Sequence, residues 1–284
     1  MPEGPEIRRA ADRVAEVLLN RPLVDVAFAC DAFPHLQVAA NGLIGQSVKR
    51  VDTRGKAMLI RFSGGLTMYS HNQLYGRWVT AAIDEVPPST RTLRVALGTA
   101  THRALLYSAS DIALFDEMEL STHPFLTRLG PDILDQQLTT GQIVERARSR
   151  EFRNRNFAAL LLDQSFLAGV GNYLRSEILF AAGISPWSTP TQLTTKQLVA
   201  IARQALQISQ RSYRTGGITN PMRRAAEIRR QLRQSGEPPT LESYRFAVFR
   251  REAAPCYACR QPIRKVSAAS RPLFYCAACQ GVCA

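Results

Sequence analysis

Four cysteines near the C-terminus limit the possible folds of this chain more than any other feature. Cys256 and Cys259 form one C-x2-C pair, Cys276 and Cys279 form another, and 16 residues separate the pairs. Two such pairs can surround one tetrahedral ion, and this spacing is typical of zinc sites. Because four thiolates leave no coordination position open, we expect one structural Zn²⁺ that lets a small hairpin unit fold.

The two remaining cysteines are Cys30 and Cys283. We expect Cys30 to be an ordinary thiol, and Cys283 fits the zinc site less well than the paired cysteines. The sequence has no run of about 18 apolar residues and no basic-then-apolar start, so we expect neither a membrane span nor a signal peptide. A cytosolic location follows, where disulfides are rare and clustered cysteines favour metal binding.

Basic residues are unevenly distributed along the chain. It has 284 residues with 36 Lys and Arg, 23 Asp and Glu, and a net charge of +13. Residues 1–150 contain 17 basic and 16 acidic side chains, whereas residues 151–284 contain 19 and 7. The basic half favours a polyanion partner, nucleic acid in particular. A basic surface that serves solubility is the alternative.

Hydrophobic spacing divides the chain into a strand-rich part and a helical part. Apolar residues at helical spacing after Pro5 predict a helix over about 5–19. Short runs rich in branched and aromatic residues predict about eight strands over 23–115, as in a β-sandwich or barrel. Further helices are expected at 139–149, 155–164, 172–182 and 194–212, and at 221–235 with Asn220 as its cap.

The first residues, MPEGPE, are unusually dense in proline and glutamate. If Met1 is removed, Pro2 presents a secondary amine, and an α-amino group has a pKa of about 7.7–8.0, so a usable fraction is unprotonated at neutral pH. The carboxyl group of Glu3 could donate and take back protons beside it. The alternative is a helix-capping segment without chemistry, which suffices for Pro5 and Glu6.

Several motifs occur in a fixed order along the chain. They are MPEGPEIRRAADRV, TRGKAMLIRF, YSHNQLYGRW, RNRNFAALLLDQSFLAGVGNYLRSEIL and the four-cysteine ribbon with SRPLFYC. Together they resemble the bacterial endonuclease VIII branch of the formamidopyrimidine-DNA glycosylase family. The resemblance implies bifunctional removal of oxidised bases followed by strand cleavage. It also implies a monomeric bacterial protein, near the nucleoid, that acts on double-stranded DNA with a damaged base or abasic site.

The expected fold is a multidomain α+β protein. We expect an N-terminal catalytic β-sandwich domain with a leading helix over 1–122 and a linker over 123–135. A helix-two-turn-helix DNA-binding domain would follow over 136–243, and a zinc-ribbon hairpin over 244–284.

The resemblance implies four catalytic residues. Pro2 would attack the sugar and form a Schiff base, with Glu3 as the proton donor and acceptor. Lys56 would act at the sugar or at its phosphate, although a turn lysine is ordinarily solvated. Arg271, in the cysteine hairpin, would clamp the phosphates that flank the lesion, and a hairpin that binds protein instead is the alternative.

Five further residues are expected to bind DNA. Gln73, Leu74 and Tyr75 would fill the space left by an extruded base, although a turn of this kind can also point into a core. Asn172 would hold a phosphate where the glycine-rich turn opens a helix, and Arg175 would assist it.

Residues 211–243 depart from the endonuclease VIII pattern. They carry seven arginines: Arg211, Arg214, Arg223, Arg224, Arg229, Arg230 and Arg233. These either lengthen the DNA footprint or form a solvated helix face. The sequence GGIT at 216–219 resembles the mobile lesion-contacting loop of the formamidopyrimidine branch, so oxidised purines are an alternative to oxidised pyrimidines. The alternative of another class is a non-catalytic zinc protein that binds DNA.

Overall fold

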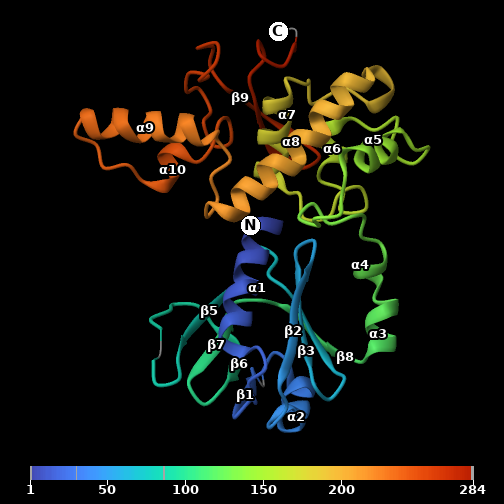
Figure 1. Ribbon diagram of the computed structural model, residues 1–284, viewed down its shortest axis with the longest axis vertical. Helices are drawn as coiled ribbons and strands as arrows, with labels where there is room; N and C mark the ends of the chain where they lie inside the picture. Colours follow the sequence, from blue (N-terminus) through green and yellow to red (C-terminus); the bar gives the residue numbers. More distant parts are fainter. Residues whose placement is uncertain (1, 30, 86, 283–284) are drawn as a thin grey trace. The chain divides into compact units, whose positions relative to one another are not determined.

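The computed structural model describes residues 2–29, 31–85 and 87–282, so Cys30 and Cys283 lie outside the described residues. The chain divides into two compact units, Met1–Arg128 and Leu129–Ala284 (Figure 1). This boundary falls within the segment 123–135. The segments 136–243 and 244–284 both belong to the second unit.

Two antiparallel sheets form the first unit, with strand orders β1-β6-β7-β5 and β2-β3-β4-β8. The strands are β1 Asp25–Phe28, β2 Val48–Arg54, β3 Ala57–Phe62, β4 Thr67–His71, β5 Arg77–Ala82, β6 Leu93–Gly98, β7 His102–Tyr107 and β8 Asp111–Phe115. Each corresponds to one of the short runs within 23–115. The predicted β-sandwich is therefore confirmed.

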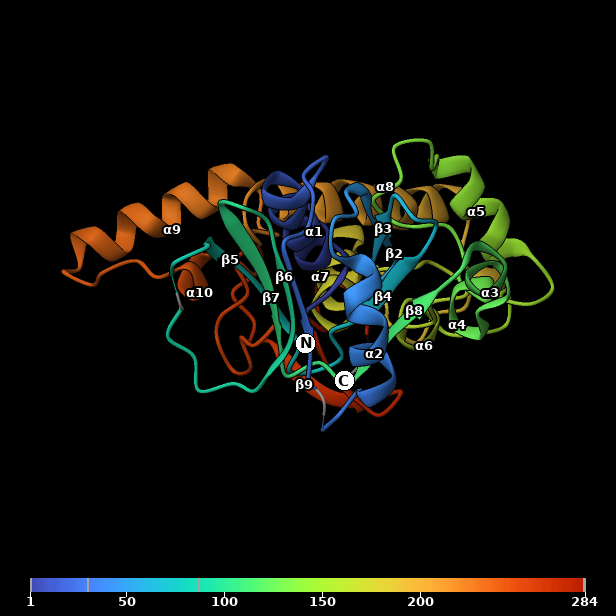
Figure 2. The same ribbon diagram turned by 90° about the horizontal axis from the view of Figure 1, so that it is seen from below.

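Helix α1, Gly4–Leu18, packs against strands of both sheets (Figure 2). Its buried stripe includes Ile7, Ala11, Val14 and Leu18. These side chains join Met58, Ile60, Trp78 and Leu106 in one apolar core between the sheets. Burial of this stripe fixes α1, and so it fixes the residues that begin the helix.

Three helices of the first unit were not predicted. Helix α2, Pro34–Leu43, buries Leu36, Ala40 and Leu43 against the same core. The short helix α3, Glu117–Thr122, ends just before the expected linker, and α4, Pro124–Thr127, lies within it. The start of α3 could have been predicted from the sequence, because Asp116 and Glu119 have the spacing of a capping box and form one there.

The second unit is helical and ends in a β-hairpin. Its elements are α5 Thr140–Arg148, α6 Phe157–Leu160, α7 Asn172–Ala182, the 3-10 turn η1 Pro190–Gln192, α8 Thr195–Arg214, α9 Met222–Gln234, α10 Leu241–Tyr244, β9 Arg264–Ala268 and β10 Arg271–Tyr275. Helices α5, α7 and α8 share an apolar core. The helix predicted at 155–164 is shorter than expected, because only α6 forms there.

The predicted helix cap at Asn220 is wrong. The Asn220 side chain is buried and donates to the carbonyl oxygens of Tyr244 and Phe246, both at 2.9 Å. Helix α9 instead begins after Pro221 without a side-chain cap. None of the helices in the described part of the chain is long and apolar enough to span a bilayer.

Candidate functional site

The N-terminal residues are held on a rigid helix. Glu3 is only 2% exposed and precedes the first turn of α1. Its backbone N–H donates to Glu6 Oε2 at 3.1 Å, and its side chain accepts from the Glu6 backbone in a capping box. Glu6 also contacts Arg9 Nη2 at 3.2 Å. Glu3 therefore presents a fixed carboxylate directly after Pro2 in the chain. The role of Glu6 is explained by helix capping.

Lys56 lies in the tight turn between β2 and β3. It is only 8% exposed, so the alternative of an ordinary solvated turn lysine is wrong. The next residue, Ala57, pairs with His71 across β3 and β4, and the charge of Lys56 acts on His71. Lys56 is therefore a buried cation at one end of the sheet, close to the turn that follows β4.

Residues 72–76 form that turn, which we call the wedge turn. Leu74 is 50% exposed and Tyr75 is 68% exposed, so the alternative of a core-directed turn is wrong for both. Gln73 has a left-handed φ of 47°, and its side chain accepts a hydrogen bond from Ser110 Oγ at 3.2 Å. A Cβ on Gly76 would lie 2.6 Å from Asn72 Cα, so only glycine fits there. A fixed turn thus exposes two large side chains.

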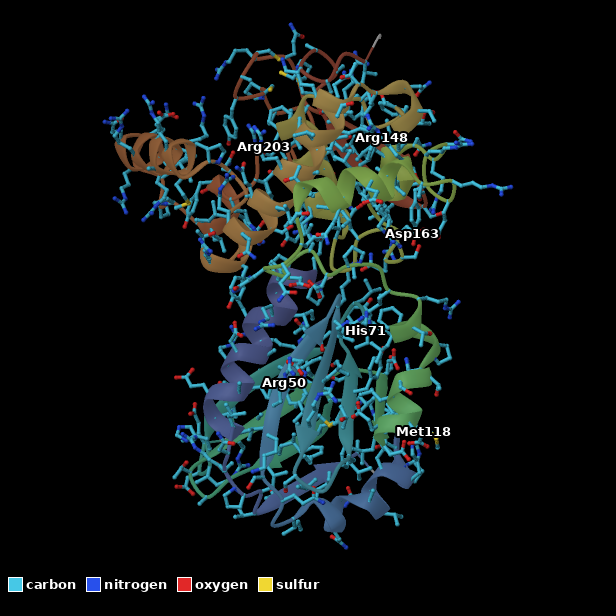
Figure 3. The ribbon with its side chains drawn as sticks, turned by 45° about the vertical axis from the view of Figure 1, so that its right-hand side comes forward. Arg50, His71, Met118, Arg148, Asp163 and Arg203 are labelled. Carbon is cyan, nitrogen blue, oxygen red and sulfur yellow. The ribbon has the colours of Figure 1, made fainter. Side chains whose placement is uncertain are left out.

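Sequence reasoning missed His71, the last residue of β4 (Figure 3). Its ring Nδ1 accepts the backbone N–H of Gln73 at 3.1 Å, which ties the ring to the wedge turn. Burial lowers the pKa of His71, and the charge of Lys56 lowers it further, against the opposing effect of Asp111. Asp111 in turn accepts from Tyr69 Oη at 3.3 Å. The sequence contained one signal, because this histidine immediately precedes the wedge motif.

In the second unit, Asn172 opens α7 and is fixed from both sides. Its Nδ2 donates to the Pro272 carbonyl at 2.7 Å, and its Oδ1 accepts from Arg175 Nη2 at 2.6 Å. These two bonds determine which end of the amide carries the hydrogens. The second hydrogen of Nδ2 is the donor that this arrangement can offer to an anion.

Arg175 does not fit the predicted contact with phosphate. Its side chain is 0% exposed, and Nη1 donates to the carbonyl oxygens of Ala158 at 2.7 Å and Ala268 at 3.0 Å. Nη2 also donates to the Pro272 carbonyl at 3.2 Å. Arg175 therefore fastens the hairpin to α7 and orients Asn172, which makes it a positioning residue.

Arg271 follows the tip of this hairpin and is exposed. The two tip residues, Ala269 and Ser270, have left-handed φ values of 52° and 58°, as a two-residue hairpin turn requires. Arg175 also donates to the Arg271 carbonyl at 3.4 Å. The structure therefore brings Asn172, Arg175 and Arg271 together in the second unit. Glu3, Lys56 and the wedge turn belong to the first.

A second charged residue of α7, Glu177, is buried and was not predicted. Its carboxylate accepts the backbone N–H groups of Ala247, Val248 and Phe249 at 2.8–2.9 Å. It also accepts the Thr219 hydroxyl at 2.7 Å. Four donors therefore fix the chain before the cysteine hairpin and the segment that contains GGIT.

The loop before α7 is shaped by its own polar side chains. Gln164 Nε2 donates to the carbonyl oxygens of Leu162 and Val170, both at 2.9 Å. Asp163, labelled in Figure 3, accepts from two side chains. Ser165 Oγ donates to it at 2.7 Å and Arg155 Nη1 at 2.5 Å. Burial alone would raise the pKa of Asp163, but these bonds outweigh it and hold the pKa below its usual range.

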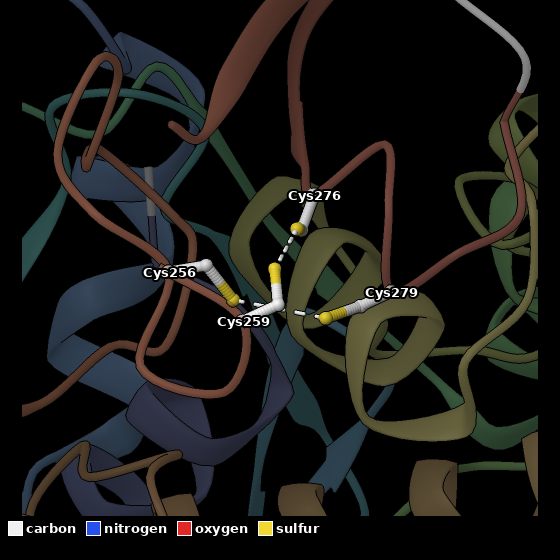
Figure 4. Close-up of side chains that lie close together, drawn as sticks. All are labelled: Cys256, Cys259, Cys276 and Cys279. Atoms are coloured by element: carbon white, nitrogen blue, oxygen red, sulfur yellow. Dashed lines mark hydrogen bonds between the residues drawn. The ribbon is translucent and has the colours of Figure 1, made fainter. Parts of the chain in front are cut away.

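The four predicted metal ligands do lie together, as Figure 4 shows. The sulfurs of Cys256, Cys259, Cys276 and Cys279 are all within 4.8 Å of one another, and none is in a disulfide. Four sulfurs at about 2.3 Å from one tetrahedral ion lie about 3.8 Å apart. The observed separations of 3.4 Å for Cys259–Cys276 and 3.8 Å for Cys256–Cys279 fit that geometry. The cluster could hold one metal ion.

Comparison with known proteins gives consistent results. Residues 1–111 match the formamidopyrimidine-DNA glycosylase N-terminal domain, and residues 129–223 match the formamidopyrimidine-DNA glycosylase H2TH domain. The Lactococcus lactis Fpg (MutM) bound to DNA with N7-benzyl-Fapy-dG has the same fold, with a TM-score of 0.78, 18% identity, and coverage of 98% of this chain and 99% of that one. The same protein with abasic-site DNA gives a TM-score of 0.77.

Relatives over the full length are much closer in sequence. Endonuclease 8 of Escherichia coli O17:K52:H18 (strain UMN026) is 48% identical over 280 residues, which covers 99% of this chain and 100% of that protein. Endonuclease 8 of Shigella sonnei (strain Ss046) is 47% identical over the same length and coverage. The chain therefore belongs to the endonuclease 8 branch of the formamidopyrimidine-DNA glycosylase family.

Proposed function

We propose that this protein is a bifunctional DNA glycosylase and AP lyase that removes oxidised pyrimidines from double-stranded DNA. The full-length similarity to endonuclease 8 carries this proposal. The local structure agrees with it, because a buried carboxylate follows Pro2 and a fixed turn exposes two large side chains.

Pro2 is the nucleophile. After removal of Met1, the proline nitrogen attacks C1′ of the sugar, the glycosidic bond breaks, and the base leaves with the electron pair and takes up a proton. The ring opens to an iminium ion, which has no N–H proton to lose and therefore draws electrons from C2′. Loss of the C2′ proton expels the 3′-phosphate, a second elimination expels the 5′-phosphate, and water then releases Pro2.

Glu3 and Lys56 transfer protons and stabilise charge during that step. Glu3 is adjacent to the nucleophile and held by the capping box, so it protonates the leaving oxygen or base and later accepts a proton. Lys56 is a buried ammonium at one end of the sheet, and it holds the sugar phosphate or protonates the ring oxygen.

The wedge turn keeps the duplex open while the damaged base is extruded. Leu74 enters the base stack, Tyr75 stacks on a neighbouring base, and the Gln73 amide pairs with the orphaned base. Asn172 and Arg271 hold the phosphates beside the lesion, and Arg175 sets the spacing between those two residues. Held phosphates on a bent backbone favour extrusion.

The metal ion held by the four cysteines is zinc, and its contribution is structural. It joins the two C-x2-C turns so that the hairpin with Arg271 keeps its shape, and it supplies no chemistry to the reaction. The protein works as a monomer. Because its substrate is DNA, it works in the bacterial cytosol, at the nucleoid.

Borohydride trapping tests the proposal. A chain whose mass shows that it begins at Pro2 is mixed with duplex DNA that contains 5-hydroxyuracil, and the reduced adduct is mapped by peptide mass. We expect one adduct at Pro2, and none from a matched sample that retains Met1. Absence of any adduct from the processed chain would favour a non-catalytic DNA-binding protein.

Matched duplexes test the substrate class. One carries 5-hydroxyuracil and the other carries 8-oxoguanine, and single-turnover excision rates are compared. We expect faster excision of the pyrimidine. A clear preference for 8-oxoguanine would establish the alternative, the same chemistry on oxidised purines.

A further inference from the structure

Helix α9 carries a row of arginines that the reaction does not use. Among its 13 residues are five arginines and one acidic residue, Glu227. Glu227 pairs with Arg223 at 3.3 Å and with Arg224 at 3.1 Å. Arg229, Arg230 and Arg233 are exposed and form no ion pair within the described part of the chain. We call Arg223, Arg229, Arg230 and Arg233 the arginine face.

Packing on the opposite side of α9 holds the arginine face in place. Ala225 and Ile228 are buried on the opposite side of α9, and α10 packs against the helix. The guanidinium of Arg224 lies 5.7 Å from the centre of the Tyr257 ring, and that of Arg229 lies 5.3 Å from the Tyr244 ring. Within the second unit, α9 extends away from α7 and α8, with α10 beside it (Figures 1 and 2). The charged side of a fixed helix is therefore open to a partner.

The shape of this face fits phosphate groups. Three arginines and Gln234 surround a hollow above Ala226, whose short side chain leaves space between Arg229, Arg230 and Arg233. From Arg223 to Arg233 the helix rises about 15 Å at 1.5 Å per residue. Along the duplex axis, one DNA strand presents about four phosphates over that length, since each adds about 3.4 Å of axial rise.

The composition of the face favours a polyanion over a protein partner. Protein interfaces usually need aromatic or large apolar anchors. Exposed positions on α9 are occupied by Arg, Gln and Ala, apart from Met222 at its first residue. We propose that the arginine face of α9 binds the phosphate backbone of duplex DNA outside the lesion, as a second DNA-contacting surface of this enzyme. The proposal rests on the function proposed above.

The test compares the double variant Arg230→Gln/Arg233→Gln with the parent. Glutamine keeps helix propensity and removes two charges. Duplexes of about 10 and about 30 base pairs carry the same central abasic analogue, and Kd is measured against salt, because each lost phosphate contact lowers the log–log slope by about 0.9. We expect the slope on the long duplex to fall by about 2 and the affinity about tenfold, with little change on the short duplex.

A second variant tests the hollow without a change of charge. Ala226→Leu fills the space that a phosphate would occupy and keeps helix propensity. We expect it to lower the slope on the long duplex by about 1. The charge control is Arg150→Gln/Arg203→Gln, which removes two exposed arginines from the same unit outside α9. Arg203 is labelled in Figure 3. Equal losses in this control and in the α9 double variant would overturn the proposal, as would an unchanged slope in the α9 double variant.

Borohydride trapping separates this proposal from the proposed function. For this assay 5-hydroxyuracil replaces the abasic analogue in the short duplex, because the adduct needs a sugar C1′ that can form the iminium ion. The α9 variants should form the Pro2 adduct as fully as the parent when enzyme saturates this duplex. If the parent forms no adduct, the proposed function fails. If all proteins trap equally and also bind the long duplex equally, only the α9 proposal fails.

Discussion

The two compact units organise their polar residues in opposite ways. The first unit has 14 basic and 13 acidic side chains, a net charge of +1, and it is built on an apolar core between two sheets. Its buried charged residues, Glu3 and Lys56, are themselves candidate site residues. The second has 22 and 10, a net charge of +12, and buries two charged side chains of α7, Arg175 and Glu177. In the first unit the wedge turn exposes Leu74 and Tyr75 at the end of strand β4. In the second, buried charges hold the backbone that presents Asn172 and Arg271.

Because of this difference, changes at the wedge turn of the first unit should affect function without affecting stability. Changes at the buried charges of the second unit should affect both. A change at Leu74 removes an exposed side chain and leaves the core of the first unit intact. A change at Arg175 or Glu177 leaves buried partners unsatisfied and also moves residues of the DNA surface. We therefore expect variants at the exposed wedge-turn residues of the first unit to be stable and inactive, and buried-charge variants of the second to be both unstable and weak in binding.

Loss of the metal should have the largest effect. Cys259→Ser removes one of four ligands, and structural zinc contributes about 10–16 kcal/mol in small zinc units. We expect zinc content to fall from one per chain to near zero, DNA affinity to fall with it, and the first unit to stay folded. Metal analysis and circular dichroism check this result. Full zinc occupancy in the variant would contradict the assigned ligands.

Removal of the Glu177 carboxylate should rank second. Glu177→Ala leaves three backbone N–H groups without their acceptor, whereas the Thr219 hydroxyl still has the Arg245 carbonyl oxygen at 2.8 Å. Since each buried unpaired donor costs about 1–3 kcal/mol, we expect the second unit to lose about 3 kcal/mol or more in urea unfolding. Glu145→Ala, at an exposed position of α5, is the matched control and should change stability by less than about 0.5 kcal/mol. Equal midpoints for the two variants would disprove the organising role.

The fold was predictable wherever a local pattern decided it. The eight strands and helices α1, α7 and α8 follow from their apolar patterns. Helices α1 and α8 bury one face, whereas α7 and strand β3 are buried on nearly all sides. Helix α2 was missed because it is short and lies among strands, where its apolar residues fit either period. Asn220 was misread because a capping residue and a buried amide look alike in sequence, and distant carbonyl groups determine which one forms.

The candidate site was predictable to the extent that its chemistry is local. The four cysteines follow from their spacing alone, whereas the roles of Pro2 and Glu3 rest on the resemblance to the family, because their position also fits a helix-capping segment. Arg175 was predicted to bind phosphate because arginine commonly does so. It is instead buried by contacts with residues that lie about a hundred positions later in the sequence. One signal was available, because Arg175 and Glu177 interrupt an otherwise apolar helix. Charges at such positions indicate buried polar networks.

Truncation of the wedge should reduce activity without loss of stability. Leu74→Ala removes a side chain that offsets part of an unstacking cost of a few kcal/mol, and about 1.4 kcal/mol is tenfold in rate. We expect excision from duplex DNA to slow at least tenfold and the melting temperature to stay within a few degrees. Leu93→Ala, similarly exposed on β6, should leave the rate unchanged. Because a single strand needs no wedge, equal slowing on single-stranded substrate would contradict the role of Leu74.

The smallest effect concerns pH and the histidine beneath the wedge turn. Burial and Lys56 lower the pKa of His71, whereas the unfolded histidine titrates at about 6.5. Between the two values the unfolded chain binds more protons, so stability of the first unit falls as pH falls through this range. Protonated Nδ1 also cannot accept the Gln73 N–H. From about pH 7.5 to about pH 5.5 we expect the parent to lose more thermal stability than His71→Gln, with faster amide exchange at Gln73.

The control is His35→Gln, at an exposed position of α2, which should retain the parent's pH dependence. If His71→Gln lost as much thermal stability as the parent over this pH range, His71 would not control the turn.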